Sequence, residues 1–216
     1  MSWLITGSQP IPAVIGESFG GGYFAGYISH TADGNATHAL IVAPRATGAT
    51  GTSYTLTTNL QWKTATTTTA GTTSPFDGAA NTAAMVTAGI ANHPAANFCE
   101  NLSIGGFTDW YLPARYELDI AYFHLKPETT ANTTIYGTNI YAVPQRNSNY
   151  TAAYPSQTPL TAFNTTAEAF VAVPHWSSTE LGPSDGWDVV FSTGGQGAVG
   201  TKTQLIRVRA FRRIAL

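Results

Sequence analysis

The hydrophobic and polar positions of the chain predict strands near both ends and helices between them. Two apolar runs at residues 23–29 and 37–44 flank an Asp-Gly-Asn turn at 33–35, and this arrangement predicts a β-hairpin. Beyond residue 174, glycine-rich turns separate three further runs with strand character. These runs cover residues 175–180, 186–192 and 204–214. The pattern as a whole predicts an α+β fold.

Between the strands, the stretch from Gly105 to Leu125 predicts a tight turn, a short extended run and an amphipathic helix. Gly105 and Gly106 suit the turn, because glycine accepts a positive φ without a steric penalty. Pro113 suits the first turn of the helix, where its missing N–H costs nothing. Pro127 ends the helix. The apolar stripe expected to face the core has helical spacing and consists of Leu118, Ala121, Tyr122 and Leu125.

A second helical pattern spans residues 77–102 and breaks at Gly89. The low-complexity run at 66–74 predicts an exposed loop. Residues 126–166 form the longest stretch without periodicity, and a loop of this length is usually either functional or disordered. No linker divides the rest of the chain. We therefore expect one domain over residues 11–216, preceded by a docking segment at 1–10.

Composition narrows the functional classes. Only 10% of the residues are charged, the net charge is −2 and the pI is near 6.2, so no general attraction to nucleic acid or an anionic membrane is expected. No apolar run reaches the ~18 residues of a membrane span. The start lacks a signal-peptide pattern. The single cysteine, Cys99, excludes an intrachain disulfide and is expected to be a buried, inert thiol.

Several motifs occur in a fixed order along most of the chain, from about Ile11 to Arg213. They read IGESFGGGYFAGYI, THALIVAP, LQWKT, ANTAA, GGFTDWYLPARYEL, HWSSTE, GWDVVFSTG and IRVRAFRR. Together they resemble the Lcl C-terminal-like family. The resemblance implies a C-type-lectin-like α+β domain related to the formylglycine-generating-enzyme fold. In that fold, N- and C-terminal strands pair in one sheet, two helices pack on it, and long loops carry ligand binding. Such domains are common in phage tail proteins and bacterial adhesins.

The motif residues are expected to be structural. Trp110 and Trp176 should lie in the core with each indole N–H bonded to an acceptor. The C-terminal arginines alternate with apolar residues on one strand, so a nucleic-acid patch is the weaker interpretation. A buried arginine needs a carboxylate, and Glu117 and Glu180 are the expected partners. The motif residues are Trp110, Pro113, Glu117, Trp176, Glu180, Arg207 and Arg209.

Ligand binding is predicted at the long loop and at two rim loops. Tyrosines among Asn, Ser and Gln have the composition of an adaptable binding surface, although they could instead hold the loop to the domain. Trp187 follows a Gly-Pro-Ser-Asp-Gly loop, where an aromatic ring can stack on a sugar. The candidate residues are Tyr136, Tyr141, Tyr150, Tyr154, Asp185, Trp187 and Gln196.

Enzymatic chemistry has little support in the sequence. Cys99 is alone, whereas formylglycine-generating relatives use paired cysteines or copper. The histidines are scattered without metal-ligand spacing, and the motifs of calcium-dependent lectins are missing. The carboxylates show no pair that spacing alone would identify. We therefore expect no catalytic residues, no metal and no cofactor.

These observations predict a non-enzymatic protein of the phage virion, exposed on the tail or capsid. The expected role is a receptor-binding or tail-fibre-tip domain that recognises a bacterial surface ligand, with glycan favoured. Further expected partners are other virion proteins, bound through the N-terminal segment, and copies of the same chain, with a trimer favoured. No nucleic acid and no membrane insertion are expected. The alternatives are a structural virion component, such as a capsid decoration or a tail or baseplate scaffold, and an enzyme of the formylglycine-generating type.

Overall fold

The structure is a computed structural model that describes residues 11–51, 59–164, 167–197 and 200–216. The predicted docking segment at residues 1–10 lies outside the described residues. The strands are β1 (Ser18–Phe19), β2 (Gly22–Ile28), β3 (His38–Val42), β4 (Ala142–Val143), β5 (Pro174–Glu180), β6 (Gly186–Val190) and β7 (Phe211–Ala215). The helices are α1 (Arg45–Gly48), α2 (Gly78–Thr87), η2 (Ile90–Asn92), α3 (Pro94–Glu100), α4 (Arg115–Leu125) and α5 (Thr161–Asn164).

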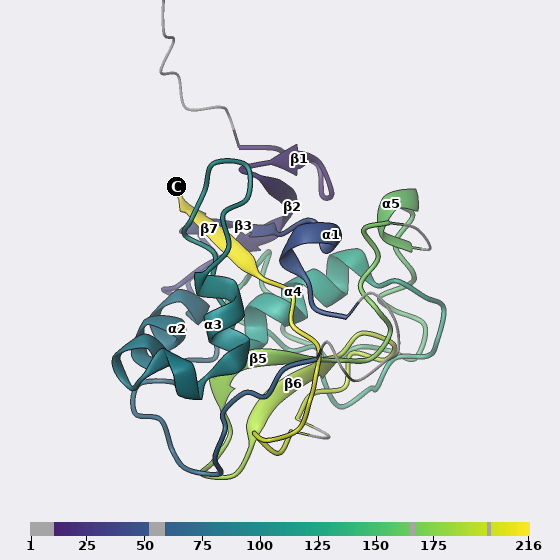
Figure 1. Cartoon of the computed structure of the whole chain (residues 1–216). Coiled ribbons are helices and arrows are strands. Elements are labelled where there is room, and N and C mark those ends of the chain that lie inside the picture. The colour runs from purple at the N-terminus through teal and green to yellow at the C-terminus, as the bar shows by residue number, and fades with distance from the viewer. Residues whose placement is uncertain (1–10, 52–58, 165–166, 198–199) are drawn as a thin grey trace, which may run out of the picture.

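The larger sheet joins strands from the two ends of the chain. Its order is β1-β2-β3-β7, with β4 added to β2, and all of these pairs are antiparallel. Leu40 of β3 faces Arg213 of β7 in the register. β5 and β6 form a separate two-stranded sheet. Figure 1 shows α4 between the two sheets, and α2 and α3 to one side. The predicted α+β class and the hairpin at 23–44 are confirmed.

Helix α4 fills the space between the sheets with the face that its sequence predicts. The residues of the expected apolar stripe are all buried: Leu118, Ala121, Tyr122 and Leu125. The helix starts at Arg115, so Pro113 precedes the N-cap residue Ala114 and does not lie in the first turn as predicted. Pro113 instead bonds to β5: its carbonyl oxygen accepts a 2.7 Å hydrogen bond from the Ser178 amide.

Three local predictions are confirmed: the tight turn at residues 105–106, the helix break at Gly89 and the burial of Cys99. Gly105 and Gly106 have φ of 61° and 83° in the tight turn between Ile104 and Phe107. The predicted break at Gly89 separates α2 from α3, and its φ of 105° explains why glycine is used there. Cys99 is buried in α3, and burial raises its pKa well above the usual value, as expected for an inert thiol.

The low-complexity run at 66–74 is a loop, as predicted, and most of its residues are exposed, but two of its threonines are buried. Thr69 and Thr72 are buried, and both bond to the Glu180 carboxylate: the Thr69 amide at 3.0 Å and the Thr72 hydroxyl at 3.3 Å. Lys202 also bonds to this carboxylate and forms a buried ion pair with it. One threonine amide and one threonine hydroxyl therefore help to satisfy a buried charge that the sequence pattern did not reveal.

Arg209, Arg212 and Arg213 pair with carboxylates other than those expected. Arg209 is buried and pairs with Glu168, with a distance of 2.8 Å between Nη2 and Oε2. Glu117 accepts instead from the Ala114 amide and the Tyr111 hydroxyl, each at 2.7 Å. The predicted strand at 204–214 is regular only in β7. Before β7, residues 206, 207 and 209 make isolated bridges to Leu60, His175 and Ala49.

The predicted core tryptophans are confirmed. Trp110 and Trp176 are at most 1% exposed. Their indole N–H groups donate to the carbonyl oxygens of Phe107 at 3.1 Å and Leu60 at 2.8 Å. No helix in the described part of the chain has the length and apolar character needed to cross a membrane.

Candidate functional site

A row of half-buried aromatic side chains crosses the surface where α4 meets the long loop. We call this row, with the arginine in it, the aromatic stripe. Its members come from five separate parts of the chain. They are Trp187, Arg115, Tyr116, Tyr141, Phe76 and His30.

One end of the stripe is built around a guanidinium group. The Arg115 Cζ lies 3.8 Å from the centroid of the Trp187 ring and 5.2 Å from that of Tyr116. Both distances fall within the range of a cation–π contact. The Gly197 backbone also lies against the Trp187 ring, because a Cβ at this glycine would come within 2.5 Å of the ring. Trp187 is therefore fixed in place by two neighbours.

The stripe continues through ring-to-ring contacts. The rings of Tyr116 and Tyr141 are 5.8 Å apart between centroids, and Tyr141 stacks on Phe76 at 4.2 Å with an interplanar angle of 18°. His30 meets the edge of Phe76 at 5.2 Å. Burial and the nearby Arg213 lower the pKa of His30 to about 4, so that the imidazole is neutral at pH 7.

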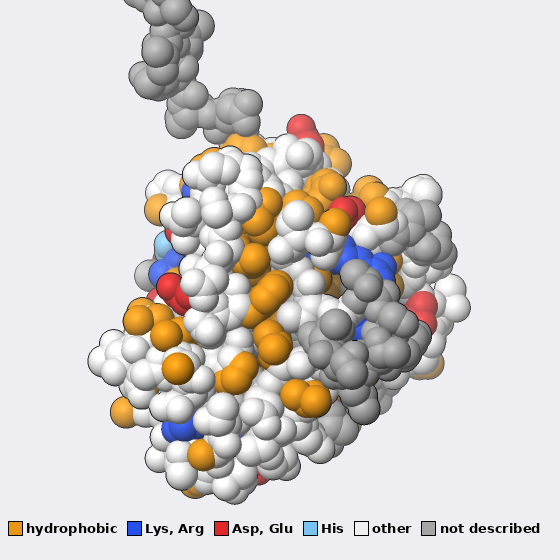
Figure 2. Space-filling model, viewed as in Figure 1, with side chains coloured by type: hydrophobic (Ala, Val, Ile, Leu, Met, Phe, Trp, Pro, Cys, Tyr) orange, Lys and Arg blue, Asp and Glu red, His pale blue; other side chains and the backbone are white. Residues whose placement is uncertain are grey.

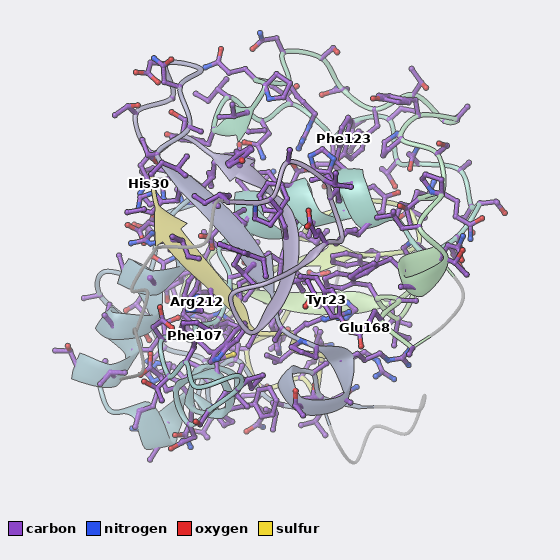
Figure 3. The ribbon with its side chains drawn as sticks, turned by 90° about the horizontal axis from the view of Figure 1, so that it is seen from above. Tyr23, His30, Phe107, Phe123, Glu168 and Arg212 are labelled. Atoms are coloured by element: carbon purple, nitrogen blue, oxygen red, sulfur yellow. The ribbon has the colours of Figure 1, made fainter. Side chains whose placement is uncertain are left out.

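Regular elements and backbone bonds position these side chains. Arg115 and Tyr116 occupy the first turn of α4, and Trp187 lies in β6. The Tyr116 amide donates a 2.7 Å hydrogen bond to the Pro75 carbonyl, which fixes Phe76 next to it. His30 follows β2, and Figure 3 shows it at one side of the larger sheet. A surface held in this way is preorganised for binding.

A buried carboxylate ties the long loop at 126–166 to α4. Asp119 is 1% exposed, and four side chains donate to it. On Oδ1, Tyr150 donates at 2.5 Å and Gln196 at 3.1 Å; on Oδ2, Asn139 donates at 2.7 Å, and Arg146 donates and forms an ion pair. The loop has little regular structure, yet this network gives it a defined path over the helix.

Two of the predicted ligand-binding residues, Tyr150 and Gln196, are buried within this network. Tyr150 is 4% exposed and Gln196 is 3% exposed, so their side chains lie inside the protein and do not form part of a contact surface. Gln196 also accepts a hydrogen bond from Arg115, which connects the Asp119 network to the aromatic stripe. For Tyr150, the alternative interpretation holds: it fastens the loop to the domain.

The remaining candidates are accessible to different degrees. Tyr141 and Trp187 belong to the stripe, and Tyr136 lies close to it, because its hydroxyl donates to the Gln196 carbonyl at 2.7 Å. Tyr154 is 59% exposed and packs edge-on against Phe123, away from the stripe contacts. The half-buried Asp185 lies in the rim loop at 181–186, where its carbonyl accepts from two backbone amides.

Sequence reasoning missed four members of the stripe. Tyr116 carries a signal that could have identified it, because it lies outside the spacing of the apolar face of α4 and stays accessible. Arg115 lies three residues before Leu118, in step with that face, so spacing does not identify it. Phe76 stands next to Asp77, the N-cap of α2, where a half-buried aromatic ring is unremarkable in sequence. His30 gives no sequence signal, because its place depends on the fold of the 28–38 turn.

Metal ligands and titratable groups bear on what chemistry the site could carry out. Within the described ranges, no three His, Cys, Asp or Glu side chains gather as metal ligands. Burial raises the pKa of Glu117 to about 7, a value suited to acid–base chemistry. Yet this carboxylate is fully buried under Gly78 and bonded to Tyr111, so a substrate has no access to it. In comparisons with known proteins, no protein-family model matches the chain and no curated protein matches it.

Proposed function

We propose that the protein is a non-enzymatic recognition protein of the phage virion with a C-type-lectin-like fold, exposed on the tail or capsid surface. In this proposal the aromatic stripe binds a bacterial surface glycan without a metal ion. The ordered sequence motifs support the fold, together with the pairing of N- and C-terminal strands in β3 and β7. The aromatic stripe is the observation on which the proposed function rests.

The stripe has the properties that a sugar-binding surface requires. Sugar rings present apolar faces that stack on aromatic side chains, and hydroxyl groups that bond to polar neighbours. The members of the stripe are only half-buried and are already fixed by contacts with one another, so little side-chain entropy is lost on binding. A row of rings, as opposed to a single deep pocket, suits an extended chain of sugar units.

A single such site is expected to be weak, and repetition of the domain would compensate. When several copies are joined, the second and third binding events become intramolecular, and the combined affinity can exceed that of one site by about 10²–10⁴-fold. We therefore propose that the protein acts as a homo-oligomer, with a trimer favoured.

Adsorption of the fluorescently labelled protein to a panel of intact bacterial strains tests the function. We expect saturable, strain-selective binding that is unchanged by EDTA, since the stripe contains no metal ligand set. Soluble polysaccharide from a bound strain should compete. Binding that EDTA abolishes would contradict metal-independent recognition, and an absence of binding to every strain would favour the structural role in the virion.

Substitutions then test the stripe itself. Tyr141→Ser and Tyr116→Ser should each weaken binding by ~10-fold or more, which corresponds to ~1.4 kcal/mol. Ile135→Ser is the matched control, because this residue is 70% exposed on the same loop and has no part in the stripe. Tyr154→Ser tests whether the ligand binds the aromatic stripe or the loop surface near Phe123. If this variant weakens binding more than Tyr141→Ser does, the ligand contacts the loop near Phe123 instead.

A further inference from the structure

An open apolar groove lies on the larger sheet, on the side where β1 and the C-terminal end of β7 meet. Its volume is about 1050 Å³, and its lining includes Ile11, Phe19, Phe107, Arg212, Ile214 and Leu216. Figure 3, seen from above, shows Phe107 and Arg212 side by side. Figure 2 shows that hydrophobic side chains also form a band down the middle of the adjoining face, below β1 and between α1 and α3. The groove therefore exposes apolar surface of the kind that usually marks a binding site.

The charge in the groove is already neutralised. Arg212 forms an ion pair with Asp109, and its Cζ lies 3.8 Å from the centroid of the Phe107 ring. The guanidinium therefore offers little attraction to an anionic partner. An occupant of this groove should be apolar and uncharged.

The edge of the sheet beside the groove is also open. β7 is the last strand in the order of the larger sheet. Along its outer edge, the only bridge within the described residues joins Phe211 to Tyr111. The residues of β7 beyond Phe211 therefore present unpaired backbone groups to a neighbouring extended segment.

The chain itself enters the described structure in this groove. Ile11 is part of the lining, and the Pro12 carbonyl accepts a 3.3 Å hydrogen bond from the Tyr27 hydroxyl of β2. Residues 1–10 precede this point and read MSWLITGSQP, without a charged side chain. Their apolar cluster of Trp3, Leu4 and Ile5 matches the chemistry of the groove. Trp3 lies eight positions before Ile11, enough to reach about 26–29 Å when the chain is extended.

We propose that the N-terminal segment 1–10 folds back onto its own domain, with Trp3, Leu4 and Ile5 in the groove beside the outer edge of β7. Three observations carry this proposal. The groove is apolar with its one cation paired, the segment carries an apolar cluster and no charged side chain, and the segment departs from the groove wall itself. Docking would cover Leu216, which is 58% exposed in the described structure.

Limited proteolysis of the full-length protein with chymotrypsin gives the first test, because this protease cuts after aromatic and large apolar residues. We expect the bonds after Trp3 and Leu4 to be protected, as followed by mass spectrometry. The combined variant Trp3→Ser, Leu4→Ser, Ile5→Ser should melt about 2–4 °C lower. Fast cleavage of the wild-type segment, together with an unchanged melting temperature in this variant, would overturn the proposal.

Substitution on the groove side provides an independent check. Leu216→Asp places a charge in the groove and should expose the wild-type segment to chymotrypsin. Its effect on melting should not add to that of the segment variant, because both remove the same contact. Leu205→Asp is the matched control, since this leucine is 45% exposed outside the groove. Equal cleavage in the two aspartate variants would contradict docking in this groove.

A disulfide decides between the segment of the same chain and that of a second copy. The double variant Leu4→Cys, Leu216→Cys should form an intramolecular bond under mild oxidation, independent of protein concentration. Leu4→Cys with Leu205→Cys should not, and the buried Cys99 should not react in either. Covalent dimers alone would overturn the proposal and assign the groove to the segment of a second copy.

Discussion

The hydroxyl of Tyr150 donates a 2.5 Å hydrogen bond to Asp119 Oδ1 and so joins the long loop to the helix 31 residues earlier. The tyrosine ring is buried with the carboxylate, and it packs against Tyr122 with centroids 5.5 Å apart. A loop that looks unstructured in sequence is thereby attached to the most central helix of the domain. The loop can present side chains such as Tyr141 in one fixed arrangement.

Asp119→Asn should destabilise the domain by about 3–5 kcal/mol, since it leaves Arg146 buried without its counter-charge. The new amide group would also face two donors, Asn139 and Arg146, on Oδ2. Urea unfolding followed by circular dichroism measures the change. We also expect faster hydrogen exchange throughout the 126–166 loop, because the loop depends on this carboxylate.

The matched control is Asp109→Asn, which also removes the carboxylate of an aspartate–arginine pair. The Asp109 side chain is 56% exposed, so its pair with Arg212 should contribute only ~0–1 kcal/mol. A similar loss of stability in the two variants would show that burial of Asp119 does not determine its importance.

Tyr150→Ser and Tyr154→Ser should differ sharply, although the two tyrosines lie on the same loop. Tyr150 is buried, and its removal leaves a cavity and takes away one of the four donors to Asp119, with an expected loss of about 3–5 kcal/mol. Tyr154 contributes one edge-on contact with Phe123, worth about 1 kcal/mol. Thermal melting of both variants distinguishes them, and equal melting temperatures would contradict the assigned burial.

Trp110→Ala and Trp176→Ala should each cost about 3–5 kcal/mol, because both rings are buried in the core. Each substitution also leaves a carbonyl without its indole donor: that of Phe107 or that of Leu60. Trp187→Ala serves as the comparison, since this ring is only half-buried. Denaturant midpoints close to that of the wild type for the first two variants would refute their core role.

His175 should make the protein sensitive to acid. Burial, with Arg207 and Arg209 nearby, lowers its pKa from 6.5 to about 3, and its Nδ1 lies 2.9 Å from the Val173 carbonyl oxygen. Between pH 6.5 and 3 the unfolded chain binds one more proton at this residue than the folded chain. Stability should therefore fall as the pH drops through this window, by up to ~1.4 kcal/mol per pH unit.

Urea midpoints measured from pH 7 to pH 4.5 test this prediction. His175→Asn retains a donor for Val173 but does not titrate, so its stability should depend less steeply on pH. Some slope should remain, because burial also lowers the pKa values of His30 and His124 to about 4. Glu117 acts in the opposite sense, as its raised pKa favours the folded state when the pH falls. Identical slopes for the two proteins would contradict the prediction.

Features that depend only on residues close together in the sequence could be predicted from it. The break at Gly89, the turn at Gly105 and the buried stripe of α4 all follow from backbone conformation or helical spacing. The strand predicted over residues 204–214 is regular only at Phe211–Ala215, because the residues before it make isolated bridges to three different segments. Arginine and apolar residues alike are buried over 206–210, and Arg209 finds its carboxylate at Glu168, 41 residues earlier.

The candidate site was harder to predict, because its members meet only in the folded chain. Tyr141 and Tyr150 lie in the same stretch without periodicity, yet one ring is half-exposed and the other is buried on Asp119. Asp119 itself lies between Leu118 and Ile120, and nothing in that pattern shows that four donors will surround it. Long-range polar partners carry no local signal, so spacing and composition cannot identify them.

The pairing of β3 with β7 has a consequence for synthesis of the protein. Residues 38–42 leave the ribosome early, but their ladder partners at 211–215 follow only after some 170 further residues have been translated. Until then, the apolar side chains of β3 lie at an open sheet edge, and contacts of such long sequence separation form slowly. The domain should therefore complete its fold after translation, and a product interrupted before residue 211 should be prone to aggregation or degradation.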